Sequence, residues 1–166
     1  MDDEVAALQP PPPAGKLARR SRTAGAALDA ADEDEISRAD RIAAARARTR
    51  LSREPAVELE PDRAIARVLL PGERLLAFRA GAALDRRATE AGRTGGLAGD
   101  LYLTSTRLVF LGRVMVSYPL ADLVEVALSD SGLLLLLGDG SGARLGVDWP
   151  QLLRVELAAA RLAAAG

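Results

Sequence analysis

The side chains that could carry out catalysis are few in this chain of 166 residues. It contains no cysteine and no histidine, which excludes a thiolate nucleophile, a zinc finger and a Ser-His-Asp triad. The acid–base groups that remain are the carboxylates, Tyr102, Tyr118 and Lys16, and no pair of carboxylates stands out from ordinary turn and surface acids. We therefore expect no catalytic residues, no cofactor and no metal, but a protein that binds.

Arginine is the side chain whose chemistry is most abundant in the sequence. Lys16 is the single lysine among the 22 basic residues. Guanidinium groups match phosphate oxygens with paired hydrogen bonds. Arg86, Arg87 and Arg93 lie close together in a predicted loop, which makes them candidate contacts to an anion or a lipid headgroup. A solvated loop is the alternative, because acidic residues are interleaved with these arginines.

The overall charge and the apolar runs exclude further classes of protein. The net charge is -1, so no nucleic-acid partner is expected. The longest strongly apolar run, Leu133–Leu137, is far below the roughly 20 residues of a membrane-spanning helix, so we expect no transmembrane segment. Met1-Asp2-Asp3-Glu4 opens the chain without a basic and apolar leader. The sequence therefore predicts a cytoplasmic protein, with a peripheral position at the inner face of the membrane as the alternative.

Residues 1–60 differ in composition from the rest of the chain. The run Pro10–Pro13 favours extended polyproline II, and large apolar residues are too scarce to offset the chain entropy. We predict a disordered tail, rich in Pro, Ala and Arg, with one local helix near 34–51, where acidic residues come first and arginines last. The apolar stripe expected on this helix is Ile36, Ala39, Ala43, Ala47 and Leu51.

Residues 61–166 carry the patterns of a packed domain. A short helix is predicted over Asp62–Leu69, ended by Pro71-Gly72. Alternating apolar and polar residues, typical of half-buried strands, follow. Strands are predicted at or near 75–84, 101–104, 108–111, 114–120, 124–128, 133–137 and 144–147. The glycine-rich segment 92–99 lacks the Gly-Lys-Ser/Thr ending of a phosphate-binding loop and is predicted to connect two strands.

The period then changes from two to about 3.6 and indicates a C-terminal helix. Asp148 is predicted to be its N-cap, with Pro150 in the first turn. The face expected to pack inward is Trp149, Leu153, Leu157 and Ala160. A closed barrel would protect the edges of seven short strands, and one amphipathic helix would cover its open end. No strand–helix–strand alternation occurs, which excludes a parallel nucleotide-binding sheet.

Three segments carry a resemblance to a known family. Residues 70–73 have the sequence LPGE, residues 99–110 have the sequence GDLYLTSTRLVF, and residues 116–123 have the sequence VSYPLADL. They resemble the opening, the hairpin, and the following strand and turn of pleckstrin-homology-like (PH-like) domains of the GRAM type. Ser105 stands where the usual hairpin has Asn. The resemblance covers about residues 61–166.

The resemblance implies a mainly β fold, a bent antiparallel barrel of about seven strands capped by one C-terminal helix. It implies a structural role for the motif residues Pro71, Gly72, Glu73, Leu103, Thr104, Arg107 and Leu108. The head of Arg107 is expected on a nearby carboxylate or carbonyl. In eukaryotic PH domains, basic residues in and beside the loop between the first two strands grip inositol phosphates, but Asp100 stands here where that site has a basic residue. From the excess of arginine over lysine we expect a GC-rich genome of the actinobacterial type.

Two functions follow as alternatives. The first is a non-enzymatic PH/GRAM-like binding or scaffold module that engages a protein partner. The second is peripheral binding to an anionic membrane surface through the loop arginines and those of the tail helix. The tail arginines are Arg38, Arg41, Arg46, Arg48, Arg50 and Arg53.

Overall fold

The structure, a computed structural model, describes residues 17–87, 96–130 and 132–166. The predictions for the run Pro10–Pro13 and for Arg93 lie outside the described residues. By its internal contacts the chain divides into two units, Met1–Ile36 and Ser37–Gly166. The second unit contains the sheet, the C-terminal helix and the last residues of α1.

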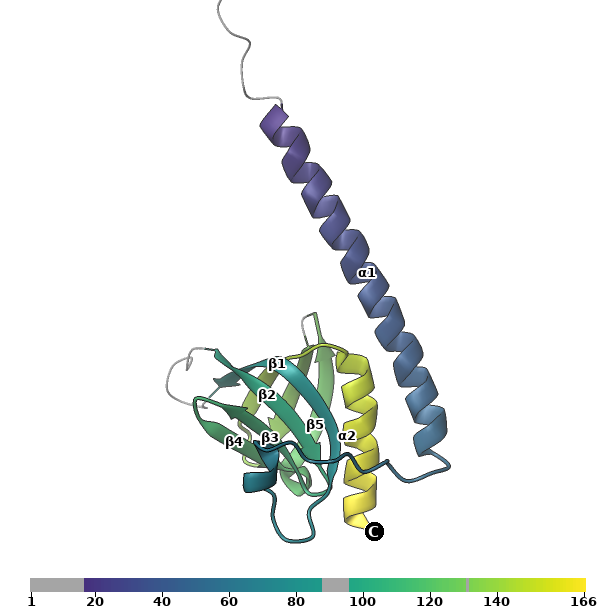
Figure 1. The fold of residues 1–166 in the computed structure, drawn as a ribbon, viewed down its shortest axis with the longest axis vertical. Coiled ribbons are helices and arrows are strands. Elements are labelled where there is room, and N and C mark those ends of the chain that lie inside the picture. Colours follow the sequence, from purple (N-terminus) through teal and green to yellow (C-terminus); the bar gives the residue numbers. More distant parts are fainter. Residues whose placement is uncertain (1–16, 88–95, 131) are drawn as a thin grey trace, which may run out of the picture. The chain divides into compact units, whose positions relative to one another are not determined.

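Along the chain, one helix precedes the strands and a second helix follows them (Figure 1). They are α1 (Leu17–Leu51), the 3-10 turn η1 (Ile65–Arg67), β1 (Leu75–Arg87), β2 (Leu97–Thr104), β3 (Arg107–Gly112), β4 (Met115–Pro119), the 3-10 turn η2 (Leu120–Asp122), β5 (Leu123–Ser129), β6 (Gly132–Leu137), β7 (Gly142–Gly146) and α2 (Pro150–Ala165).

The helices near the start of the chain differ from the sequence-based expectation. α1 begins at Leu17 rather than near residue 34, because Ala and Arg, both strong helix formers, continue toward the N-terminus. The helix expected over Asp62–Leu69 is one 3-10 turn. The Asp62 carboxylate caps this turn by accepting hydrogen bonds from the N–H groups of Ala64 and Ile65, and the Pro71-Gly72 turn follows soon after.

All seven strands join one antiparallel sheet in the order β4-β3-β2-β1-β7-β6-β5. The long strand β1 connects its two halves, because β1 pairs with β2 from Leu75 to Leu84 and with β7 from Ala83 to Arg87. The register shifts between Arg79 and Ala82. Gly81 lies at this shift with a φ of 65°, a backbone conformation that residues other than glycine rarely adopt. The Asp100 carboxylate accepts a hydrogen bond from the Gly81 N–H at 3.0 Å and fixes this irregularity.

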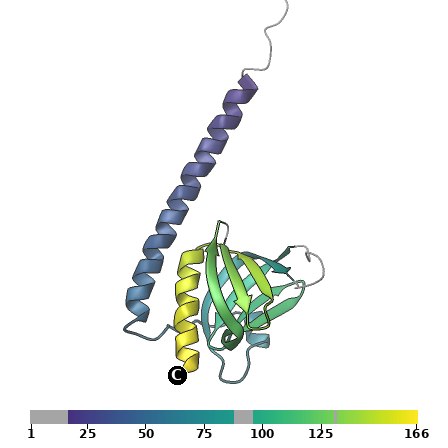
Figure 2. The same ribbon diagram turned by 180° about the vertical axis from the view of Figure 1, so that it is seen from behind.

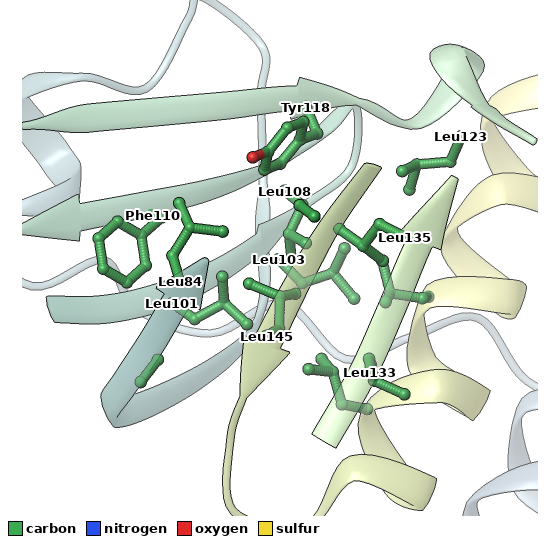
Figure 3. Close-up of a cluster of buried hydrophobic side chains, with 14 of the residues drawn as sticks. Leu84, Leu101, Leu103, Leu108, Phe110, Tyr118, Leu123, Leu133, Leu135 and Leu145 are labelled. Atoms are coloured by element: carbon green, nitrogen blue, oxygen red, sulfur yellow. The ribbon is translucent and has the colours of Figure 1, made fainter. Parts of the chain in front are cut away.

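The bent sheet encloses a leucine-rich core (Figure 3). Leu101 and Leu103 of β2 face Leu108 and Phe110 of β3 across their strand pair, and all four are buried. The opposite face of these strands is covered as well, since Tyr102 and Val109 pack with Ile65 in a second, smaller cluster. β2 is therefore buried on both faces, although strands of an antiparallel sheet are often wet on one side.

α2 packs against β1, β5, β6 and η2, beside the strands seen from behind in Figure 2. Its inward face is Leu153, Leu157 and Ala160, all buried, as the helical spacing predicts. The inclusion of Trp149 in that face was wrong. Trp149 precedes Pro150, which disfavours a helical conformation at the residue before it, and it adopts a left-handed φ of 59° with 38% of its surface exposed.

Candidate ligand-binding groove

The turn Leu70–Arg74 that precedes β1 folds a carboxylate back onto its own backbone. Gly72 has a φ of 78°, a conformation that glycine accepts without strain, and Pro71 precedes it. The Glu73 N–H donates to the Leu70 carbonyl at 3.0 Å, and the Leu70 N–H donates to Glu73 Oε2 at 2.8 Å. These bonds direct the Glu73 side chain toward the β2–β3 hairpin.

Glu73, Thr104 and Arg107 form one network at the end of β2 and the start of β3. Arg107 donates to both Glu73 oxygens, from Nε to Oε1 at 2.9 Å and from Nη2 to Oε2 at 3.0 Å. Arg107 Nη2 also donates to the Val68 carbonyl at 2.6 Å, and the hydroxyl of Thr104 lies 2.5 Å from Glu73 Oε1. A bidentate pair of this kind is strong and geometrically specific.

The hydrogen bonds of this network stabilise the charged form of Glu73. Burial by itself would raise the pKa of Glu73, but hydrogen bonds from Arg107, Leu70, Thr104 and Thr106 outweigh it and lower the pKa to about 2. Its side chain is 1% exposed. The remaining motif residues, Leu103 and Leu108, are a buried cross-strand pair of the core. The hydrogen bonds of the network engage both Glu73 oxygens, the Thr104 hydroxyl, and Nε and Nη2 of Arg107, which supports the structural role expected for these residues.

Two of the candidate anion contacts, Arg86 and Arg87, lie in a strand and not in the predicted loop. Arg86 and Arg87 are the last residues of β1, paired with Ala143 and Gly142 of β7, so their assignment to a loop was wrong. The strand continues this far because β7 supplies partners for its main-chain groups. The pKa of the Tyr118 hydroxyl is raised by burial, and a hydrogen bond with Arg86 partly opposes the rise. Arg86 is therefore already engaged with a neighbouring side chain.

The prediction that Asp148 caps the N-terminus of α2 was wrong, because a residue of α1 takes this role. Asp148 makes no capping hydrogen bond. The carboxylate of Asp40, on α1, accepts hydrogen bonds from the N–H groups of Gln151 at 2.8 Å and Leu152 at 2.9 Å. Asp40 is 2% exposed. Its negative charge therefore lies at the N-terminus of α2, where the helix dipole favours an anion, and it connects α1 to α2.

The face of α1 that packs inward overlaps the expected stripe. Ala47 is buried, Ala39, Ala43 and Leu51 are half-buried, and Ile36 is 58% exposed. The stripe omitted Asp40 and Ala44, which are buried as well. The buried aspartate gave no signal in the hydrophobic pattern, since its role depends on main-chain groups more than 100 residues away.

A groove of about 710 Å³ runs between α1, the start of β1 and α2, within the unit Ser37–Gly166. α1 contributes Arg41, Ala44, Ala45, Arg48 and Leu51 to its lining. α2 contributes Gln151, Arg154, Val155, Ala158, Ala159, Ala160, Leu162 and Ala163. Arg74, Leu76 and Leu128 close it on the side of the sheet. Its volume is within the range of ordinary ligand sites, about 300–1,000 Å³.

The charged residues that line this groove are mostly basic. Arg41, Arg48, Arg74 and Arg154 line it together with a single acid, Glu54. All four arginines are exposed, and none of them forms an ion pair with another residue in the described ranges. The rim of the groove is therefore cationic, although the whole chain is nearly neutral.

The half-buried acid of α2, Glu156, does not line the groove. Glu156 points to the sheet, where it accepts a hydrogen bond from Arg79 Nη2 at 2.6 Å. Burial raises the pKa of Glu156, and the Arg79 guanidinium partly opposes the rise. This pair joins α2 to β1 and leaves the outward stripe of α2 to small and apolar side chains around Arg154.

The groove was not predicted from the sequence, although one pattern in the sequence is consistent with it. Arg41, Ala44, Ala45 and Arg48 recur at helical spacing, as do the lining residues of α2. What the sequence lacked was the placement of the two stripes beside each other. For other chemistries, the described ranges contain no group of three or more His, Cys, Asp or Glu residues that could hold a metal, and no described helix is long and apolar enough to cross a membrane.

The strand order and the helix that follows the last strand confirm the predicted fold class. The seven-stranded antiparallel sheet followed by one helix is the architecture that the resemblance to PH-like domains implies. Solved structures with a similar fold include the N-terminal PH domain of Vps36, at 20% identity and a TM-score of 0.42 over 57% of this chain and 82% of that one. The PH domain of USP37 has 21% identity and a TM-score of 0.39 over 51% and 95%. The C-terminal domain of an unknown protein from Leishmania infantum has 16% identity and a TM-score of 0.43 over 55% and 87%. No family model and no curated protein match the sequence.

Proposed function

We propose that this chain is a non-enzymatic PH-like binding module that engages a protein partner through the groove between α1 and α2. The observation that carries the proposal is the combination of an apolar floor with a cationic rim in a groove of about 710 Å³. Apolar surface supplies affinity on binding, and the placed charges supply orientation and specificity. Assignment to the GRAM type, an actinobacterial origin and a cytoplasmic location remain predictions from the sequence.

A protein partner is favoured over an anionic membrane by where the arginines lie. Arg41 and Arg48 stand two helical turns apart on α1, and Arg154 stands on α2, so the cations follow the length of an apolar groove. A membrane-binding cluster would converge on a headgroup or face a flat surface. Arg86, one of the candidate lipid contacts, interacts with Tyr118.

Site-specific photocrosslinking of the full chain in the cells that make it tests the proposal. A benzoyl-phenylalanine placed at Ala159, in the groove, is expected to form an adduct with one protein, mapped by mass spectrometry to one segment of that protein. The same residue placed at Val114, which is 49% exposed and does not line the groove, is the matched control. Equal adducts from both positions, or none from Ala159, would overturn the proposal.

Co-sedimentation with phosphatidylglycerol vesicles tests the membrane alternative. We expect the full chain to stay in the supernatant even at low salt, where charge attraction is strongest. Pelleting that is abolished by Arg87→Glu with Arg93→Glu in the loop, or by Arg38→Glu with Arg46→Glu on the tail helix outside the groove, would support the membrane function instead. The vesicle and crosslinking experiments therefore assign binding to one surface or the other.

A further inference from the structure

We infer that the groove takes an acidic amphipathic helix, about three turns long, from the partner protein. The inference rests on the proposed function and names the chemistry of the segment that binds. Four features of the groove carry it: the spacing of its lining residues, their size, their charge, and the rigid connection between its two walls.

The lining residues of α2 form one complete helical stripe. Seven of the eight form the stripe at steps of three and four, and the eighth, Ala160, belongs to the buried inward face; the seven are Gln151, Arg154, Val155, Ala158, Ala159, Leu162 and Ala163. Over these positions a helix rises about 18 Å, at roughly 1.5 Å per residue. The stripe on α1 begins at Arg41 and continues through Ala44, Ala45 and Arg48 to Leu51, over a rise of about 15 Å. Two helical stripes of about three turns that line one groove form the kind of surface on which a third helix packs.

The small side chains along both walls leave space for the backbone of that third helix. Ala45 on α1 and Ala159 and Ala163 on α2 line the groove. Larger apolar side chains beside them lack cover, since Leu162 is 78% exposed and Leu128 is 41% exposed. A leucine or similar residue of an incoming helix would cover them and remove apolar surface from water.

A helix fits this surface better than an extended peptide. Most of the lining comes from two helices, whose own main-chain groups are already bonded within each helix. An extended peptide would bring unpaired N–H and C=O groups against apolar walls, which costs free energy. A helix satisfies its main chain internally and presents only side chains.

The charges of the rim determine that the incoming helix is acidic. Arg41 and Arg48 stand seven residues apart on one wall, and Arg154 stands on the other. Carboxylates at similar spacing on the two flanks of an apolar stripe would meet these guanidinium groups in pairs. Glu54 is the single acid in the lining, so a basic helix would meet mostly like charges.

The two walls of the groove are connected before any ligand arrives. Asp40 accepts two hydrogen bonds from the first turn of α2, and Ala44 and Ala47 are buried beside it. The partner helix therefore does not have to order the groove, which reduces the entropic cost of binding.

Fluorescence anisotropy with a synthetic peptide tests the inference on the full-length protein. The probe is a labelled peptide of about 14 residues, with leucines at steps of three and four and glutamates on both flanks of that stripe. We expect it to bind, and to bind more weakly as salt is raised. A peptide of the same composition, scrambled to destroy the stripe, is expected to bind at least about tenfold more weakly.

Two matched variants identify the surface that the peptide contacts. Arg41→Glu with Arg48→Glu reverses the rim of the groove, and Arg38→Glu with Arg46→Glu makes the same charge change at exposed positions of α1 outside it. The first variant should weaken the acidic peptide at least about tenfold and gain binding of the peptide with Lys in place of Glu, because opposite charges then face each other again. The second variant should leave the binding of both peptides unchanged. Thermal unfolding verifies that both variants fold.

The outcomes separate this inference from the proposed function. Equal binding of scrambled and amphipathic peptides, no binding of either, or equal loss in both variants would overturn the acidic helix. If the crosslink from Ala159 maps to an extended or basic segment, the acidic helix is wrong while the groove still binds a protein. Light scattering that shows a dimer lost in Arg41→Glu with Arg48→Glu would assign the groove to a second copy of this chain and overturn both.

Discussion

The Asp40 carboxylate accepts a hydrogen bond from the Leu152 N–H at 2.9 Å, although the two residues are 112 positions apart. The first N–H groups of a helix have no partner within the helix, and a nearby side chain usually supplies one. In this protein the partner comes from a different helix. The start of α2, the end of α1 and the groove between them therefore depend on one buried carboxylate.

Asp40→Ala is expected to lower the free energy of unfolding by about 1–2 kcal/mol, because two N–H groups of α2 lose their acceptor. Asp148→Ala, at the exposed aspartate that precedes α2, is the matched control and should change it by less than about 0.5 kcal/mol. Urea unfolding measures both. A larger loss from Asp148→Ala than from Asp40→Ala would mean that α2 is capped locally.

Arg107→Ala is expected to be among the most destabilising single changes in the domain. It leaves the Glu73 carboxylate, 1% exposed, without its cation, and breaking a buried pair in this way costs about 3–5 kcal/mol. Arg113→Ala, at an exposed arginine, should cost less than about 0.5 kcal/mol. Glu73→Gln combined with Arg107→Met should cost less than Arg107→Ala alone, since no charge is then left buried. Chemical unfolding that shows equal losses for Arg107→Ala and Arg113→Ala would exclude a structural role for this pair.

The stability of the domain should fall in acid because of Glu73. Its pKa is about 2 in the folded protein and 4.5 when unperturbed. A lowered pKa means that the unfolded chain binds the proton more tightly, so the contribution is complete above about pH 4.5 and is lost as the pH falls toward 2. Urea unfolding at about pH 6 and about pH 3 measures the difference. Glu73→Gln should reduce this pH dependence, and an unchanged dependence in that variant would contradict the assignment to Glu73.

Gly99→Ala is expected to destabilise the β2–β3 pair. Gly99 lies opposite Gly112, and a Cβ on Gly99 would collide with the carbonyl oxygen of Leu111. Because that obstacle is backbone, the strands must shift, at a cost of about 1–3 kcal/mol. Gly96→Ala, where a Cβ would meet no atom, is the control and should be neutral. Equal melting temperatures for the two variants would show that β2 and β3 do not approach each other this closely.

The local patterns of the sequence were sufficient for the existence and order of the strands and for the buried residues of α2. Val116 and Tyr118 alternate with exposed or half-exposed neighbours in β4 as predicted, and Leu153 and Leu157 face the core. These features depend on periodicity along a few consecutive residues, which the sequence contains directly. The bounds of β1 were less predictable, because its last residues are held by β7 rather than by their own β propensity.

The amino-acid sequence by itself determined the fold class, the absence of Cys and His chemistry, and the helix-forming composition of α1. Only the tertiary structure decided that Asp40 rather than Asp148 caps α2, that Glu73 holds Arg107, and that two stripes of alanine and arginine become one cationic groove. The physical reason is distance along the chain. Each of these features pairs a side chain with groups more than 30 residues away, and no local pattern records which distant group will be its neighbour.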